Sequence, residues 1–299
     1  MVSYTTDLGN MKTADAIISA LASPAFVENS QVLQHCQGRC FQPATSNATV
    51  RFVIDGNLVG ETVAETTAYS LSANSEITQS GVDVTVAKHV NIWAPTVEMQ
   101  RWSENTPGVH QNIGAEQGRA LSVSLNDTFI GLFDDFTNTH TTTASGVLTM
   151  ADVHDARYTF EAAVLGAKGA RAHAVLDRKA INELRKEILG STASVYTLPE
   201  NNSLLDRGAE IVDRSYVGSF GSIDFYETGG LPTAGSGALD CGLVFDPSLA
   251  FGLAIDERGI QSASKMKLSE GFYEEVASWL FANVGIYRDT AGCQLRSAT

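Results

Sequence analysis

The residues best placed for metal chemistry in this sequence are a histidine and two cysteines in one short stretch, His35, Cys36 and Cys40. Imidazole and thiolate ligands at such spacing are typical of half a zinc site, which needs a second cluster to complete four ligands. The other cysteines, Cys241 and Cys293, stand apart from each other and from any histidine. We therefore interpret the four cysteines as free thiols and expect no metal and no other cofactor. A metal site and a disulfide are the less favoured alternatives.

Two pairs of adjacent residues, His154–Asp155 and Asp134–Asp135, resemble acid–base couples. Both pairs fall in stretches with helical periodicity, where neighbouring residues do not face each other, so we interpret them as solvated helix surface. The sequence contains no Gly-rich phosphate loop, nucleophile elbow or H-E-x-x-H motif. These observations predict that the protein is not an enzyme. A hydrolase whose catalytic residues are dispersed along the chain is an alternative that motif searching does not remove.

The chain is acidic, with 34 Asp and Glu against 20 Lys and Arg and a net charge of −14. Tight nucleic-acid binding requires concentrated Lys and Arg to neutralise phosphates, so we expect no sequence-specific nucleic-acid binding. The N-terminus lacks the features of a signal peptide, and no apolar run approaches the length of a membrane span. We expect no membrane association.

A long hairpin arm is indicated by two alternating stretches that flank a polar segment. Val50, Phe52 and Ile54 alternate with polar residues, and alternation resumes from Val82 to Ile92. The intervening residues carry few large apolar groups, and a two-stranded arm without its own core is not stable alone. We expect the arm to contact another subunit. The residues expected to make this contact are Glu61, Glu65, Tyr69 and Glu76.

One long amphipathic helix is predicted for residues 113–137. Large apolar side chains recur there at steps of three and four, which places them on one stripe. The stripe consists of Leu121, Leu125, Phe129, Leu132, Phe133 and Phe136. Gly114, Gly118 and Gly131 lower helix propensity, and we expect close packing against another backbone to explain them.

The remainder of the chain alternates helices and strands. Thr149 to Asp152 forms a capping-box pattern that opens a helix to Val164, and a strand over 172–176 precedes a helix that Gly190 ends. A hairpin is predicted around 216–226, with further strands over 243–245, 251–255 and 272–286. The fold class is α+β.

The order of these elements resembles the major capsid proteins of tailed bacteriophages, which share the HK-ninety-seven shell fold. The segment Ile113 to Phe136 looks like the family's spine helix, and Leu148 to Val153 looks like the entry to its axial domain. The stretch Gly221 to Pro232 resembles the hairpin and proline segment that follow. The resemblance implies an N-terminal arm (1–50), an extended hairpin loop (51–93), a peripheral domain with the spine helix (94–147), an axial domain (148–270) and a return strand to the peripheral domain (271–299).

The resemblance also implies a function. A family member self-assembles into hexamers and pentamers that form an icosahedral phage head around double-stranded DNA, without reading the DNA sequence. The resemblance places the protein in the virion after assembly in the host cytoplasm. It implies separate scaffolding and portal proteins as partners, and cement or decoration proteins as further candidates. The shell of an encapsulin-type nanocompartment, which has the same fold, is the main alternative.

Two departures from the family pattern lead to further expectations. Some members join subunits through a Lys–Asn bond that starts at an arm lysine, whereas residues 57–83 contain no lysine and Lys88 lies at the arm's base. We therefore expect no covalent cross-links. Residues 1–50 also lack the long charged helical pattern of a built-in scaffold, which favours a separate scaffolding protein.

Overall fold

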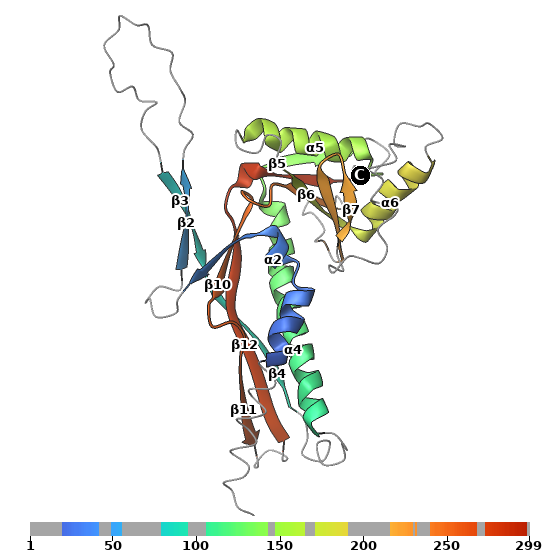
Figure 1. The fold of residues 1–299 in the computed structure, drawn as a ribbon. Helices are drawn as coiled ribbons and strands as arrows, with labels where there is room; N and C mark the ends of the chain where they lie inside the picture. The colour runs from blue at the N-terminus through green and yellow to red at the C-terminus, as the bar shows by residue number, and fades with distance from the viewer. Residues whose placement is uncertain are drawn as a thin grey trace, which may run out of the picture.

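The computed structural model combines two β-sheets, a long helix and a projecting two-stranded ribbon (Figure 1). The residues that the structure describes are 20–41, 49–55, 79–94, 106–142, 147–164, 171–190, 216–229, 231, 240–267 and 273–297.

The first sheet has six strands in the order β5-β13-β9-β6-β8-β7. Their bounds are Asn138–Thr141 (β5), Gly292–Arg296 (β13), Asp240–Phe245 (β9), Ala172–Asp177 (β6), Ile223–Thr228 (β8) and Tyr216–Phe220 (β7). Helix α5 (Met150–Ala163) packs on β5, β9 and β13, and α6 (Arg178–Gly190) packs on β6, β8 and β9. The predicted capping box is confirmed, because Thr149 Oγ1 accepts from Asp152 N and Asp152 Oδ2 accepts from Thr149 N.

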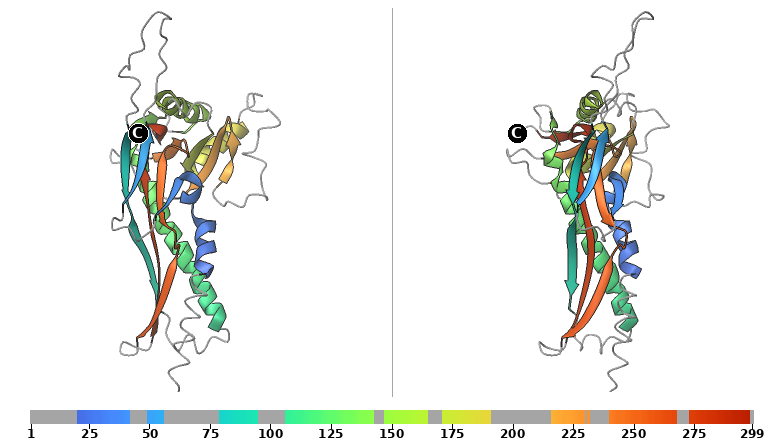
Figure 2. Two further views of the ribbon diagram at one scale, coloured as in Figure 1. Left: turned by 60° about the vertical axis from the view of Figure 1, so that its left-hand side comes forward. Right: turned by 90° about the vertical axis from the view of Figure 1, so that its left-hand side faces the viewer.

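The second sheet has five strands, in the order β1-β10-β12-β11 with β4 paired to β12. Their bounds are Gln37–Phe41 (β1), Phe251–Asp256 (β10), Tyr273–Ile286 (β12), Gln261–Lys267 (β11) and Ala87–Trp93 (β4). The long helix α4 (Thr106–Gly131) runs along one side of this sheet, together with helical residues 20–29 (Figure 2). The short helix α2 (Val32–His35) then leads into β1.

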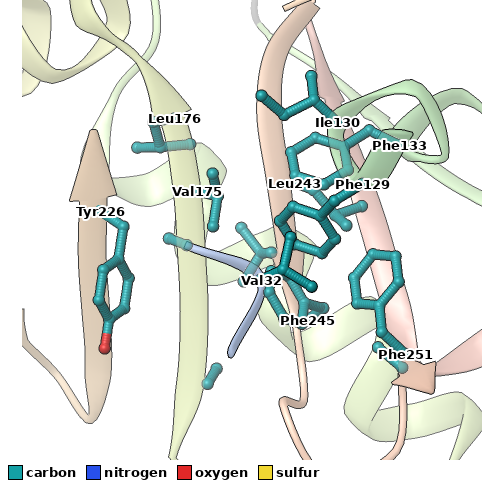
Figure 3. Close-up of a cluster of buried hydrophobic side chains, with 14 of the residues drawn as sticks. Val32, Phe129, Ile130, Phe133, Val175, Leu176, Tyr226, Leu243, Phe245 and Phe251 are labelled. Carbon is teal, nitrogen blue, oxygen red and sulfur yellow. The ribbon is translucent and has the colours of Figure 1, made fainter. Parts of the chain in front are cut away.

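The C-terminal half of α4 supplies the centre of the core (Figure 3). Leu121, Leu125 and Phe129 are at most 1% exposed, so the face on which they lie is sealed from water. The ring of Phe129 lies 4.7 Å from that of Phe251 on β10 and 6.4 Å from that of Phe245 on β9. This helix therefore packs against strands of both sheets, and the aromatic contacts join the two halves of the fold.

The bounds of the long helix differ from the prediction of 113–137. The helix starts at Thr106, where Pro107 supplies the backbone φ that suits a first helical turn. It ends at Gly131; a short 3-10 turn follows from Phe133 to Asp135, and Phe136 is extended. The stripe residues beyond Gly131 keep their burial, since Phe133 and Phe136 are each 3% exposed, while Leu132 is partly buried.

The expected role of the helix glycines holds for Gly118. A Cβ at that position would collide with the backbone carbonyl of Ala22, so glycine lets residues 20–29 approach α4 closely. At Gly131 the expectation is wrong, because a Cβ added there would meet nothing within 4 Å.

Strand pairing crosses the bounds of the predicted domains. The hairpin was expected to extend to Trp93, but β4 pairs with β12 instead of with the arm. Strands β10 and β11, expected in the axial unit, lie in the five-stranded sheet, and β13, expected to return to the peripheral unit, pairs with β5 and β9. Strand β1 of the expected N-terminal arm pairs with β10 of its own chain. These pairings join residues that are distant in sequence, and local periodicity does not predict such long-range pairing.

Candidate assembly interface

The arm base, residues 49–55 and 79–85, is a two-stranded ribbon of β2 (Thr49–Asp55) and β3 (Gln79–Thr85). The strands pair antiparallel, with Phe52 opposite Val82 and Val50 opposite Val84. Phe52 and Val84 are 1% and 4% exposed because they pack on the five-stranded sheet. The arm base is thus held by its own subunit, while residues 56–78, where the contact with another subunit is expected, lie outside the described residues.

Polar contacts hold the arm base in register on that sheet. Tyr287 Oη donates to the carbonyl of Val53 at 2.7 Å, and Asn283 Nδ2 donates to the carbonyl of Thr85 at 2.6 Å. Asn283 lies near the C-terminal end of β12, and Tyr287 follows directly after that strand. Together with the apolar packing, these contacts aim the ribbon away from the rest of the chain (Figure 1).

Where β4 pairs with β12, the same sheet has a face that is turned away from α4. On β12, residues 276, 278, 280 and 282 are buried toward α4, while the intervening side chains point to the opposite side. Register then places three β4 side chains beside them, since Val90 pairs with Trp279 and Lys88 with Phe281. We call this the outer sheet face; it consists of Lys88, Val90, Ile92, Trp279 and Phe281.

The outer sheet face is apolar except for the cation Lys88, which lies at its end nearest the arm base. Val90 and Ile92 are 46% and 58% exposed. Lys88 Nζ lies 5.2 Å from the ring centroid of Trp279 and 5.9 Å from that of Phe281, which is the geometry of a cation–π contact. An exposed apolar edge strand is a template for association, and β4 has such an edge among the described residues.

The opposite face of the same strands is tied to α4 by buried polar groups. Gln117 Nε2 donates to the carbonyl of Val276 at 3.0 Å, and Ser278 Oγ donates to Gln117 Oε1. Burial lowers the pKa of His89, which contacts Ser124 on α4, although a hydrogen bond with the Ala282 carbonyl opposes the shift. Helix α4 therefore holds β4 and β12 in place from the side opposite their exposed face.

Comparison with known proteins identifies the fold. No family model and no curated protein matches the sequence. Among solved structures, the capsid of Ralstonia phage GP4 matches with a TM-score of 0.66 at 10% identity, over 88% of this chain and 87% of that chain. The mature capsid of bacteriophage PhiM1 matches with a TM-score of 0.62 at 13% identity, over 90% and 87%. The capsid of an empty GTA particle gives 0.62 at 11% identity, over 91% and 90%.

The chain has the HK-ninety-seven capsid fold. The predicted fold class, α+β with this topology, is confirmed. Each of these capsid chains is covered over most of its own length, so the likeness includes both sheets and the long helix.

The four residues predicted at the arm contact, Glu61, Glu65, Tyr69 and Glu76, lie outside the residues that the structure describes. The outer sheet face was not anticipated. The signal for it was present in the sequence, since Lys88, Val90 and Ile92 alternate with His89 and Asn91. That alternation was assigned to the arm, because nothing local distinguishes an arm strand from a sheet strand.

Three of the four cysteines of this chain have described side chains, and the surroundings of Cys36 and Cys293 make them poor metal ligands. Cys36, Cys241 and Cys293 form no disulfide. Burial raises the pKa of Cys36 and raises that of Cys293 to about 12, so both thiols stay protonated near neutral pH. In the described part of the chain, no group of three or more His, Cys, Asp and Glu residues could hold a metal ion. Within the same residues, no helix is long and apolar enough to cross a membrane.

Proposed function

We propose that this chain is the structural subunit of an icosahedral capsid of the tailed-phage type. The observation that carries the proposal is the match of the fold to phage capsid chains. The match covers about nine-tenths of this chain and of each compared chain. Such a subunit acts by assembling: it joins hexamers and pentamers that close into a head around double-stranded DNA.

The outer sheet face supports this proposal on physical grounds. Exposed apolar surface on a rigid, edge-forming sheet is costly in a monomer and is normally covered by a partner. We infer that a second copy covers it in the shell. Many modest contacts per subunit then make the shell durable, because each subunit is held at several places at once.

The arm of a neighbouring copy is the segment that fits this face by charge. Residues 56–78 include three glutamates and no lysine or arginine, whereas the charged residue of the outer sheet face is the cation Lys88. The net charge of −14 is consistent with a wall that encloses DNA without binding it specifically. The proposal includes assembly in the host cytoplasm, with separate scaffolding and portal proteins and with cement proteins as further candidates.

The test is assembly of the full chain, expressed with its candidate scaffolding partner and followed by negative-stain electron microscopy. Wild-type protein should form closed shells. Val90→Glu should abolish or strongly reduce them while leaving the circular dichroism spectrum unchanged, because a charge is buried at the contact. Val123→Glu is the matched control, since Val123 on α4 is 50% exposed and lies on another surface. A wild-type chain that never forms shells, or equal loss in both variants, would contradict the proposal.

A further inference from the structure

Two histidines from distant parts of the chain meet in the core. His35 on α2 is fully buried, and its Nδ1 lies 3.0 Å from Nδ1 of His173 on β6. The ring of His35 stacks on Phe129 at a centroid distance of 5.8 Å and meets the edge of Tyr226 at 4.4 Å. His35 is therefore enclosed by aromatic rings, and the partly buried His173 packs against Tyr226 and Phe245, a setting that accepts neutral imidazole far more readily than imidazolium.

The hydrogen-bond pattern requires both rings to be neutral. Two Nδ1 atoms at 3.0 Å need one proton between them, and His35 Nε2 is buried with no hydrogen-bond partner among the described residues. The arrangement that leaves no buried N–H unpaired has His35 Nδ1 donating to His173 Nδ1. A further proton on His35 places an N–H in the aromatic site without an acceptor. A further proton on His173 either removes the acceptor or moves that unpaired N–H to His35.

The charged groups around the pair do not compensate for such a proton. Burial, and secondarily the neighbouring His173, lowers the pKa of His35 to about 3. Burial lowers the pKa of His173 to about 4, with Asp246 opposing the shift and Arg171 adding to it. On the other sides stand Tyr226 from β8, Phe129 from α4 and, beside His35 in the chain, the protonated thiol of Cys36.

The pair connects segments that belong to different sheets. His35 lies just before β1 of the five-stranded sheet, whereas His173 lies in the six-stranded sheet. Ahead of β1, the other side-chain hydrogen bonds that hold the segment are uncharged: Asn126 of α4 accepts from Gln31 N at 3.1 Å and donates to the Asn29 carbonyl at 3.1 Å. Gln31 Nε2 also donates to the carbonyl of Glu227 at 3.1 Å. Of these contacts, only the histidine pair responds to mild acid.

We propose that His35 and His173 form a proton-sensitive latch that holds the segment ahead of β1, residues 30–36, against the six-stranded sheet. Uptake of solvent protons on the imidazole nitrogens opens the latch and frees the segment, while both sheets stay folded. The latch is a property of the subunit, so it does not depend on the chain being a shell protein.

The direction and size of the pH effect follow from linkage. The pKa values are depressed in the closed state relative to about 6.5 for exposed histidine, so the closed state is fully favoured above about pH 6.5. As the pH falls below that value, the opening equilibrium rises by up to about tenfold per pH unit for each histidine. The rise levels off only below the depressed pKa values.

Hydrogen–deuterium exchange of the full chain tests the latch, with protection factors compared at pH 7 and pH 5 in one assembly state fixed by size-exclusion chromatography. Residues 30–36 should lose protection by at least about tenfold at pH 5, while β1, β6 and β8 keep theirs. His35→Phe, which fills the aromatic site without titrating, should reduce the slope of the logarithm of the protection factor against pH to about half that of wild type, because only His173 then titrates. His154→Gln is the control, because it deletes another histidine of lowered pKa on α5 and should leave the effect intact.

His173→Asn provides an independent variant, since its amide oxygen can replace the Nδ1 acceptor. The slope of the logarithm of the protection factor against pH should fall to about half that of wild type. This variant serves as the test if His35→Phe does not fold. The latch is refuted by a wild type whose residues 30–36 keep equal protection at both pH values. It is equally refuted if His35→Phe or His173→Asn shows the full wild-type slope.

Discussion

The ring of Phe52 on β2 lies so close to Gly252 on β10 that a Cβ on the glycine would stand 2.7 Å from Phe52 Cε1. Gly285 on β12 makes the same allowance for Val84, whose Cγ2 would be 2.5 Å from an added Cβ. The two glycines face each other across the β10–β12 pair. Because neither glycine has a side chain, Phe52 and Val84 of the arm base can pack directly against the backbone of β10 and β12. The direction of the arm therefore depends on these two glycines.

Gly252→Ala should therefore lift the arm base and lower shell yield. The Phe52 ring must move, and part of its buried area returns to water; overpacking of this kind costs about 1–3 kcal/mol. The measurement is thermal unfolding of the subunit together with particle counts by microscopy. Gly131→Ala is the control, since its Cβ meets nothing and alanine favours helix. Unchanged stability and shell yield for Gly252→Ala would show that Phe52 can move aside without loss of packing.

Phe129→Ala should cost about 3–5 kcal/mol of folding free energy, because Phe129 is fully buried between both sheets. Insoluble or unassembled protein is the expected result. Val123→Ala, on the exposed side of the same helix, should lose little. Chemical denaturation of both variants measures the difference, and wild-type stability for Phe129→Ala would show that the stripe is not a core.

Deleting Glu61 to Gln79 should leave a soluble, folded subunit that no longer forms stable shells. The arm base would still be held by Phe52 and by Tyr287, whose hydroxyl binds the Val53 carbonyl. Circular dichroism checks the fold and microscopy checks assembly. Normal shells from the deleted chain would remove the arm from the assembly contacts.

Assembled shells should contain no covalent bonds between subunits. The arm segment 57–83 has no lysine nucleophile, and Cys241 and Cys293 are buried thiols outside any disulfide. Denaturing electrophoresis of purified particles, with and without reductant, should give one band near 31.9 kDa in both lanes. A ladder that survives boiling in detergent and reductant would contradict this expectation.

The local elements of the chain could be predicted because their causes are local. The steps of three and four from Leu121 to Phe133 make one face of a helix wherever that helix packs, and the Thr149–Asp152 capping box closes within one helical turn. A tight turn at Gly221 and Ser222, both with positive φ, joins β7 to β8 as the predicted hairpin required. The order of such elements was enough to indicate the capsid fold.

Only the tertiary structure decided which strands share a sheet and which surface stays open. Strand β4 alternates just as an arm strand does, yet it pairs with β12, and that pairing places Val90 and Ile92 on the outer sheet face. His35 resembled a metal ligand beside Cys36, yet its partner is His173, far along the chain. Strand edges and buried polar groups select partners by shape and hydrogen bonding across long sequence separations. Periodicity within a segment does not predict which distant segment it will pair with.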